Sequence, residues 1–440
     1  MKKQPNQLLG LGLVLAAGIA VAEEPADPAA LRKEMQELKQ SFKDMRRAYE
    51  ARLQTLEQRL DALQKPAAER PADELEALRR DAETAAGEKA ADAEKTEATT
   101  PPKALNVFNP RITVFGDLLA RADDRKVFNE DGESVGDRIG LREVELDFRA
   151  DVDPYAKAVL ILGLEEEAPN EFTTTVEEGY ATFETLPFDL HAKVGRFRTS
   201  FGQINKLHLH DLPQVNYPLP VRTLLGEEGD NQNGLAISYL GPTLKGFVPE
   251  LEFQLLNGEN ERVLAGGDSN SPAYLGHLKL FRDVGENQFV ELGASHLFGF
   301  NDENNEQATH LTGFDFLYKW KPLERGEYRS FVFQSELFYL DREQPGANVH
   351  SLGAYGYGQY QFGKRWYAGF RGDWTEFPDS ANRDAWSVSS YLSFYTTEFL
   401  RLRVGFEHTE EDGQDPLDTL FFQLTFVFGS HPVEPYWFNK

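Results

Sequence analysis

The sequence predicts an all-β fold: an antiparallel transmembrane β-barrel of about sixteen strands, preceded by an N-terminal helical coiled coil. Two observations support this fold class. From residue 110 onward, apolar and polar residues alternate with a period of two over many short runs. The connections between these runs are alternately short and long, and the long ones are rich in Asp, Asn, Glu and Gly. This asymmetry is typical of barrels of the Gram-negative outer membrane.

Residues 1–22 have the features of a signal peptide. Lys2 and Lys3 precede an apolar run, 8–22, that ends in a small-x-small sequence at Ala22. We expect cleavage after Ala22 and export from the cytoplasm. The chain contains no cysteine, so a lipid anchor, a disulfide framework and a cysteine-ligated metal site are excluded. Beyond residue 22, no run of about 20 apolar residues predicts a membrane-spanning helix.

Residues 23–64 predict a periplasmic coiled coil, and residues 65–109 predict a flexible linker. From Leu31 to Leu63, apolar residues recur every three or four positions between charged residues, which is a heptad pattern. A lone amphipathic helix is the alternative, and the pattern does not distinguish two strands from three. The linker is rich in Ala, Glu, Lys and Pro, so it cannot bury a core. It contains no plug-sized domain, which disfavours an energy-coupled gated receptor.

Residues 110–440 predict the barrel. The clearest strand is 141–152, in which Val144 and Leu146 alternate with Glu143, Glu145 and Asp147. A soluble β-sandwich is the alternative, but so many two-faced strands would need a second sheet to cover them. A count of fourteen strands also stays open, because short apolar runs are easily miscounted. The predicted strands are 111–121, 141–152, 156–166, 176–186, 190–197, 233–240, 249–256, 274–283, 288–299, 308–320, 328–340, 349–362, 366–376, 385–396, 399–408 and 417–428.

The connection 198–232 is the third of the long loops, and it has no clean period of a strand or a helix. A connection of this length is usually functional or disordered, and its many aliphatic and aromatic residues argue against disorder. We therefore expect it to fold into the barrel and to narrow the pore. An even number of strands puts the N-terminal segment and the C-terminus on the same side, the periplasm.

The chain resembles the phosphate-selective porin family (OprP/OprO-like). The resemblance rests on the order of signal peptide, coiled coil, linker and sixteen strands, and on Gly195-Arg196-Phe197 followed by Phe201-Gly202. It implies a homotrimer, a third outer loop folded into each pore, and passive transport of anions selected by arginines and lysines in the lumen. Arg196, Arg198, Lys206 and Arg222 belong to the predicted loop or border it.

Charge leaves the ion selectivity open. The formal net charge of −26 makes nucleic acid an unexpected partner, because binding to phosphates requires clustered Lys and Arg. An acidic lumen attracts cations, whereas arginines at the narrowest point would attract anions. The residues that we expect to line the lumen are Glu143, Glu145, Asp147, Arg149, Arg371, Arg401 and Arg403. The residues that we expect at the constriction are Arg196, Arg198, Lys206, Arg222, His208, His210 and Asp211.

His208, His210 and Asp211 are also the candidate metal ligands. Alternate residues of an extended segment can converge on an ion, and imidazole with carboxylate suits a divalent metal. Polar loop chemistry is the commoner explanation of such a pair, and no fourth ligand is evident. No other cofactor is expected. We expect no enzyme activity, because no nucleophile motif or phosphate-binding glycine loop is present.

The sequence thus predicts an outer-membrane porin, a passive channel for small hydrophilic solutes or ions. The finer expectation is selectivity for anions such as phosphate. One alternative is a channel for cations or divalent metals. Another is a structural envelope tether, with the barrel as anchor and the coiled coil as the working part. Expected partners are outer-membrane lipid and lipopolysaccharide, two further copies of the chain, and peptidoglycan through the coiled coil.

Overall fold

The structure is a computed structural model that describes residues 110–127, 136–168, 171–260, 262–266, 270–324, 326 and 328–429. The predicted signal peptide, coiled coil and linker lie outside the described residues. Among those residues, no helix has both the length and the apolar character needed to cross a membrane.

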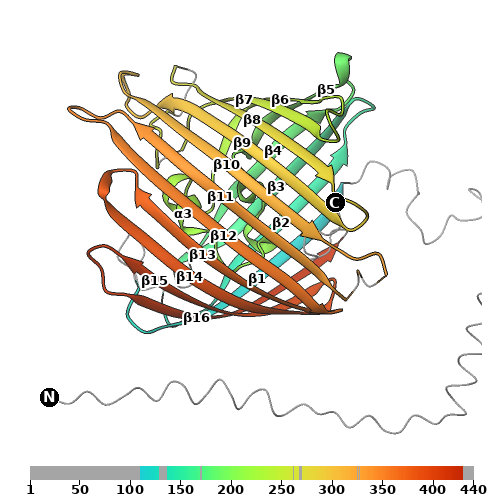
Figure 1. Ribbon diagram of the computed structural model, residues 1–440, viewed down its shortest axis with the longest axis vertical. Coiled ribbons are helices and arrows are strands. Elements are labelled where there is room, and N and C mark those ends of the chain that lie inside the picture. The colour runs from blue at the N-terminus through green and yellow to red at the C-terminus, as the bar shows by residue number, and fades with distance from the viewer. Residues whose placement is uncertain are drawn as a thin grey trace, which may run out of the picture. The chain divides into compact units, whose positions relative to one another are not determined.

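The described part of the chain is almost entirely β-structure (Figure 1). The strands are β1 (Arg111–Asp123), β2 (Ile139–Asp151), β3 (Ala156–Ala168), β4 (Glu171–Phe183), β5 (Leu190–Arg198), β6 (Asn231–Leu240), β7 (Val248–Leu256), β8 (Ala273–Asp283), β9 (Gln288–Phe300), β10 (Ala308–Trp320), β11 (Ser330–Arg342), β12 (Val349–Gly363), β13 (Trp366–Phe377), β14 (Ser380–Thr397), β15 (Leu400–Glu411) and β16 (Leu417–Gly429). The helices are η4 (Pro187–Asp189), η5 (Ile204–Lys206), η6 (Leu209–Asp211) and α3 (Leu219–Leu224).

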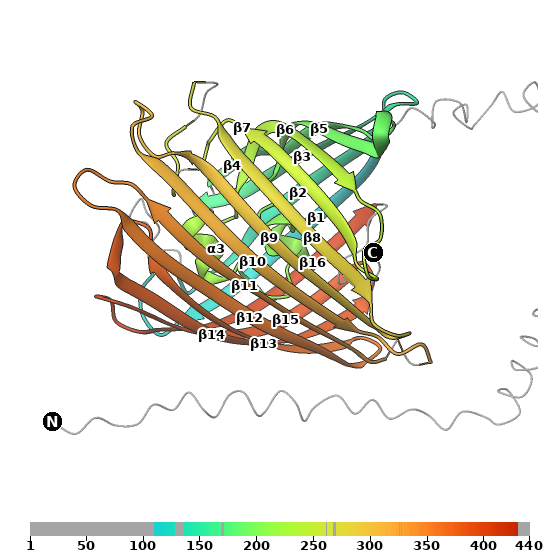
Figure 2. The same cartoon turned by 45° about the horizontal axis from the view of Figure 1, so that its top comes forward.

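These strands form one closed barrel in which each strand pairs antiparallel with its neighbours in sequence. The barrel closes where β1 pairs with β16, from Thr113 opposite Gly429 to Asp123 opposite Thr419. Figures 1 and 2 show the tilted strands wrapping around a central space. The predicted barrel of sixteen antiparallel strands is confirmed, and the alternative of fourteen is wrong.

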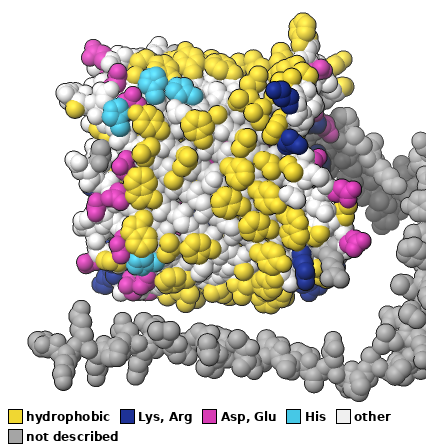
Figure 3. Space-filling model, viewed as in Figure 1, with side chains coloured by type: hydrophobic (Ala, Val, Ile, Leu, Met, Phe, Trp, Pro, Cys, Tyr) yellow, Lys and Arg dark blue, Asp and Glu magenta, His cyan; other side chains and the backbone are white. Residues whose placement is uncertain are grey.

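The alternation of side chains sets the two faces of the wall. On β2, Glu143, Glu145 and Asp147 are buried inside the barrel, at most 4% exposed. Large apolar side chains such as Leu160, Phe370 and Phe422 are exposed on the other face. Figure 3 shows hydrophobic side chains over the outer wall and charged side chains mostly near its two ends. An apolar band of this kind is what a bilayer requires of a barrel surface.

The connections define two ends of the barrel. We call the end that carries the connections β1–β2, β5–β6 and β7–β8 the long-loop end, and the opposite end the turn end. Some connections at the long-loop end are shorter than the sequence pattern indicates, because β3, β4 and β14 extend beyond their predicted limits. The β3–β4 and β13–β14 connections are 169–170 and 378–379. The extensions contain polar residues, Thr173 to Thr175 among them, which have no apolar face and therefore resemble loop.

β4 carries an irregularity that matters for the interior. Its register against β3 shifts between Val176, which lies opposite Leu162, and Glu178, which lies opposite Ile161. The bulge at Glu177 places two consecutive glutamates inside, at 6% and 8% exposure. β4 pairs with β5 over five positions, from Gly179 to Phe183. The two strands therefore separate toward the long-loop end.

Candidate functional site: an infolded loop and two charged cavities

The segment Thr199–Asp230, which connects β5 to β6, lies inside the barrel and is called loop 3 below. Within it, Glu227 alone is exposed, and every other residue is buried or half-buried. Figures 1 and 2 show α3 enclosed by the strands, and α3 contacts β12, β13 and β14. The loop is thus largely buried within the barrel.

Apolar contacts account for much of this packing. Phe201 stacks on Phe338 of β11, with ring centroids 5.7 Å apart. Buried loop residues form one hydrophobic cluster with inward-facing residues of β6 to β12, which is unusual for the wall of an aqueous pore. The loop residues of this cluster are Phe201, Ile204, Leu207, Leu209, Leu212, Tyr217, Val221, Leu224 and Leu225.

The neck of loop 3, where Thr199 and Asp230 lie side by side, is closed by hydrogen bonds. The Asn205 side chain donates to the carbonyl oxygens of Thr199, at 2.9 Å, and Asp230, at 3.0 Å. Its Oδ1 accepts from the amide of Asp230 at 2.7 Å. Burial raises the pKa of the Asp230 carboxyl. Because these groups are buried, the bonds strongly favour one conformation of the neck.

A carboxylate of the wall binds the start of the loop. Glu336 Oε1 accepts hydrogen bonds from the amides of Gln203, at 2.9 Å, and Ile204, at 2.8 Å, and from the Tyr355 hydroxyl at 2.7 Å. Gly202 approaches the same carboxylate with a φ of +62°, and a Cβ there would lie 2.1 Å from Oε2. Glycine is therefore required at this contact, which explains part of the Phe-Gly motif in the sequence.

Arginines of the wall hold the middle of the loop by its backbone. Arg401 donates to the carbonyl oxygen of His210 at 2.8 Å. Arg403 donates to those of Leu212, at 2.9 Å, and Gln214, at 2.6 Å. Arg142 donates a hydrogen bond to the carbonyl oxygen of Val215, and Arg371 donates one to that of Asn216, each at 2.7 Å. Arg371, Arg401 and Arg403 do face inward, as the alternation predicts, but they bind loop 3 rather than line an open passage.

The four cations predicted at one constriction are dispersed. Arg222 lies at the C-terminal end of α3, where it donates to the carbonyl oxygen of Tyr217 at 3.0 Å. Arg196 and Arg198 lie on β5, bound to the Val176 carbonyl oxygen at 2.9 Å and the Glu228 carbonyl oxygen at 2.5 Å. Lys206 lies in η5, where burial, with Lys279 nearby, lowers its pKa. They do not converge on one point.

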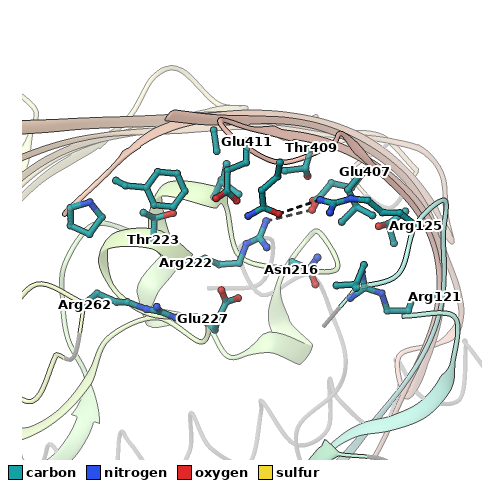
Figure 4. Close-up of a pocket in the computed structure, with 18 of the residues that line it drawn as sticks. Arg121, Arg125, Asn216, Arg222, Thr223, Glu227, Arg262, Glu407, Thr409 and Glu411 are labelled. Carbon is teal, nitrogen blue, oxygen red and sulfur yellow. Dashed lines mark hydrogen bonds and ion pairs between the residues drawn. The ribbon is translucent and has the colours of Figure 1, made fainter. Parts of the chain in front are cut away.

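Described residues line two cavities at the long-loop end, and the larger of these has a volume of about 700 Å³. Figure 4 shows side chains of α3 and of the barrel wall converging on it. Arg222 Nη2 lies 3.4 Å from Glu407, which also pairs with Arg371 at 2.9 Å. The basic residues that line the cavity outnumber the acidic ones, six to four. The basic ones are Arg121, Arg125, Lys126, Arg222, Arg262 and Arg342, and the acidic ones are Glu227, Asp379, Glu407 and Glu411.

The smaller cavity, of about 300 Å³, lies where β4 and β5 separate. It has the opposite charge balance, with six acidic residues against three arginines. Burial raises the pKa of Glu228 to about 7, with Glu165 and Glu177 adding to the effect. The acidic residues are Glu165, Glu177, Glu227, Glu228, Asp230 and Glu259, and the basic ones are Arg196, Arg198 and Arg262.

Loop 3 meets β2 and β4 in a cluster of histidines and carboxylates. His208 Nδ1 is 2.8 Å from Glu177 Oε2 and 3.2 Å from Glu145 Oε2. His210 Nδ1 is also 3.2 Å from Glu145 Oε2, and its ring stacks on Phe115 with centroids 3.9 Å apart. Burial alone would lower the pKa of both histidines, but the Glu145 carboxylate raises it, well above the ordinary range for His208.

The composition of this cluster differs from the predicted metal set. Glu145, Glu177 and His208 each offer a ligand atom within 4.8 Å of the others. Asp211 lies apart from them, with its carboxylate 3.6 Å from Nε2 of His210, the nitrogen that faces away from Glu145. Strict alternation on β4 assigns Glu177 to the outer face, so the sequence analysis missed it. A glutamate on the outer face of a predicted membrane strand was the available signal, because a charge facing lipid is costly.

No family model matches the chain. An uncharacterized protein of Aquifex aeolicus is 29% identical to it, over 67% of this chain and 70% of that protein. Among solved structures, Pseudomonas putida OprB matches with a TM-score of 0.51 and 11% identity, over 74% of this chain and 96% of that one. The outer membrane channel DcaP of Acinetobacter baumannii matches with a TM-score of 0.50 and 11% identity, over 73% and 96%. The two solved structures share the barrel fold of this chain.

Proposed function

We propose that the protein is an outer-membrane channel that passes small hydrophilic solutes down their gradients, and that loop 3 controls the passage. The observation that carries this proposal is a long loop held inside a porin-like barrel by side chains of the wall, next to a charged cavity at the long-loop end. In this proposal the long-loop end faces the outside. Both ends of the barrel domain then lie on the periplasmic side.

The solutes that we favour are small anions, with phosphate among them. The support is the larger cavity, in which basic residues exceed acidic ones. Two of its arginines, Arg125 and Arg342, have a buried Nε atom without a hydrogen-bond partner, so the protein does not satisfy all the donors of these guanidinium groups. Planar guanidinium groups are well suited to phosphate and carboxylate oxygens. The resemblance to phosphate-selective porins agrees with this choice.

The test is the reversal potential across a salt gradient, measured in a planar bilayer. We expect the unmodified protein to reverse toward the anion potential. The double variant Arg125→Gln, Arg342→Gln should shift the reversal toward the cation potential, because it removes positive charge from a focusing cavity. Lys157→Gln is the matched control, because Lys157 lies at the turn end and pairs with Glu184 at 2.6 Å. Equal shifts in both variants would contradict the assignment of selectivity to this cavity.

Two other functions remain as outcomes of the same experiment. A reversal toward the cation potential in the unmodified protein would favour the acidic smaller cavity as the path. No conductance would favour the envelope tether, a reading that the burial of loop 3 supports. In that case, deletion of residues 24–104 should abolish the effect of the protein on the cell envelope. A homotrimer, contact with lipopolysaccharide and contact with peptidoglycan stay predictions. Native mass spectrometry tests the first, and pull-down on cell-wall sacculi tests the last.

A further inference from the structure

Glu145 of β2, Glu177 of β4 and His208 of loop 3 place three ligand atoms within 4.8 Å of one another, and all three residues are buried. We propose that they bind a divalent transition-metal ion such as Zn²⁺, and that the bound ion links loop 3 to the barrel wall. One imidazole nitrogen with two carboxylate oxygens is a ligand set used for Zn²⁺ and its first-row neighbours.

Unpartnered atoms in the cluster are the second observation. Glu145 Oε2 lies 3.2 Å from Nδ1 of both His208 and His210, yet it accepts a hydrogen bond from neither. Glu177 Oε1 and His210 Nδ1 also lack hydrogen-bond partners. Glu145, Glu177 and His210 are 2%, 6% and 3% exposed, so water does not satisfy these atoms freely. Buried polar atoms without partners cost free energy, and a cation would offset that cost.

The negative charge of the buried cluster also favours a bound cation. Glu143 and Glu178 are buried beside the three proposed ligands, at 4% and 8% exposure. Glu143 Oε2 has no hydrogen-bond partner. Three permanent cations act on the cluster: Arg198, whose Nη2 lies 3.5 Å from Glu177, and Lys193 and Arg149, which act on Glu178. Arg149 also pairs with Asp147, so these cations do not neutralise all the carboxylates, and the cluster must take up protons, on the histidines among other groups, or a metal ion.

The wall leaves room for the Glu177 side chain. Gly163 of β3 lies opposite Glu145 of β2, and a Cβ at this glycine would lie 2.5 Å from Glu177 Oε1. Gly163 offers no ligand itself, but a larger residue there must displace the Glu177 carboxylate. This provides a variant that disturbs the site without removing a ligand.

An ion can reach the site from the long-loop end. Glu177 lines the smaller cavity, whose acidic residues exceed its arginines by six to three. A negative cavity concentrates cations at its inner end. The same cavity repels anions, so the proposed metal site and the proposed anion site belong to different cavities, although these adjoin at Glu227 and Arg262.

Binding is tested on the purified full-length protein in detergent, after treatment with a chelator. Titration with Co²⁺, followed by its d–d absorption and by competition with Zn²⁺, should show binding of one ion per chain. His208→Gln and Glu145→Gln should each raise the Kd by at least about tenfold, since loss of a ligand should cost no less than the 10- to 100-fold typical of an outer-shell partner. Gly163→Val should also weaken binding. His277→Gln, a buried lumen histidine that pairs with Ser295, should not.

The proposal is overturned if the unmodified protein binds no metal above buffer background, or if His277→Gln weakens binding as much as His208→Gln. Heat-modifiable migration on gels checks that each variant is folded. If the ligand variants fail to fold, X-ray absorption of the Zn²⁺-loaded unmodified protein decides. A first shell with imidazole and carboxylate supports the site, and a shell of water alone refutes it. These readouts do not require conduction, so a failed channel experiment leaves this test intact.

Discussion

Replacement of residues 201–228 by a short Gly-Ser linker should raise the single-channel conductance several-fold. A sixteen-stranded barrel without an infolded segment leaves an aqueous channel. The loop occupies that space here, because Glu227 is the one exposed residue between Thr199 and Asp230. The barrel should survive the deletion, since β5 and β6 pair up to Arg198 and Asn231, just outside the replaced segment.

The matched control replaces residues 301–307, the connection between β9 and β10, which lies outside the infolded loop. We expect its conductance to equal that of the unmodified protein. If the 201–228 variant also conducts as the unmodified protein does, loop 3 does not control the passage. If the unmodified protein is silent and the variant conducts, loop 3 closes the barrel, and the tether reading replaces the channel reading.

The strands were predictable because one physical requirement repeats along the wall. A residue facing lipid must be apolar, and the next residue faces the interior, so the alternation of Glu143, Val144 and Glu145 continues in register around the barrel. The ends of β3, β4 and β14 were not predictable, since beyond the lipid no requirement acts on the outer face. A polar hairpin that continues into water then has the same composition as a loop.

The interior of the site was less predictable, for two physical reasons. The bulge at Glu177 inverts the alternation locally, and its one mark in the sequence is a glutamate where strict alternation expects a lipid-facing residue. The partners of Arg401 and Arg403 are backbone carbonyl oxygens of loop 3, and any residue can supply a carbonyl oxygen. The sequence therefore indicated that these arginines face inward but not that they hold the loop. His208 was identifiable as a site residue, yet its partners come from strands distant in sequence.

Arg403→Met should release the middle of loop 3 while leaving the barrel intact. Arg403 donates to the carbonyl oxygens of Leu212 and Gln214, and also to Gln423 at 2.9 Å and Ser393 at 3.0 Å. Methionine fills a similar volume without donors, so it leaves the buried carbonyl oxygen of Gln214 unsatisfied, at a cost of about 1–3 kcal/mol. The carbonyl oxygen of Leu212 keeps only its 3.4 Å hydrogen bond from Arg401. The free energy of local opening should fall by about 1–3 kcal/mol on the same basis. Hydrogen exchange at the amides of Asp211 and Leu212, which bond within the loop, measures this change.

The control for this variant is Arg149→Met. Arg149 is also an arginine of the barrel, but it pairs with Asp147 at 2.9 Å and is 43% exposed in its side chain. Its loss should leave exchange in loop 3 unchanged, because Arg149 donates its hydrogen bonds to Asp147 of the same strand and none of them reaches loop 3. In bilayers, Arg403→Met should add rapid current fluctuations that Arg149→Met lacks, because a freed loop moves within the passage. Equal exchange in both variants would mean that the apolar cluster around Phe201 and Phe338 holds the loop without help from the arginines.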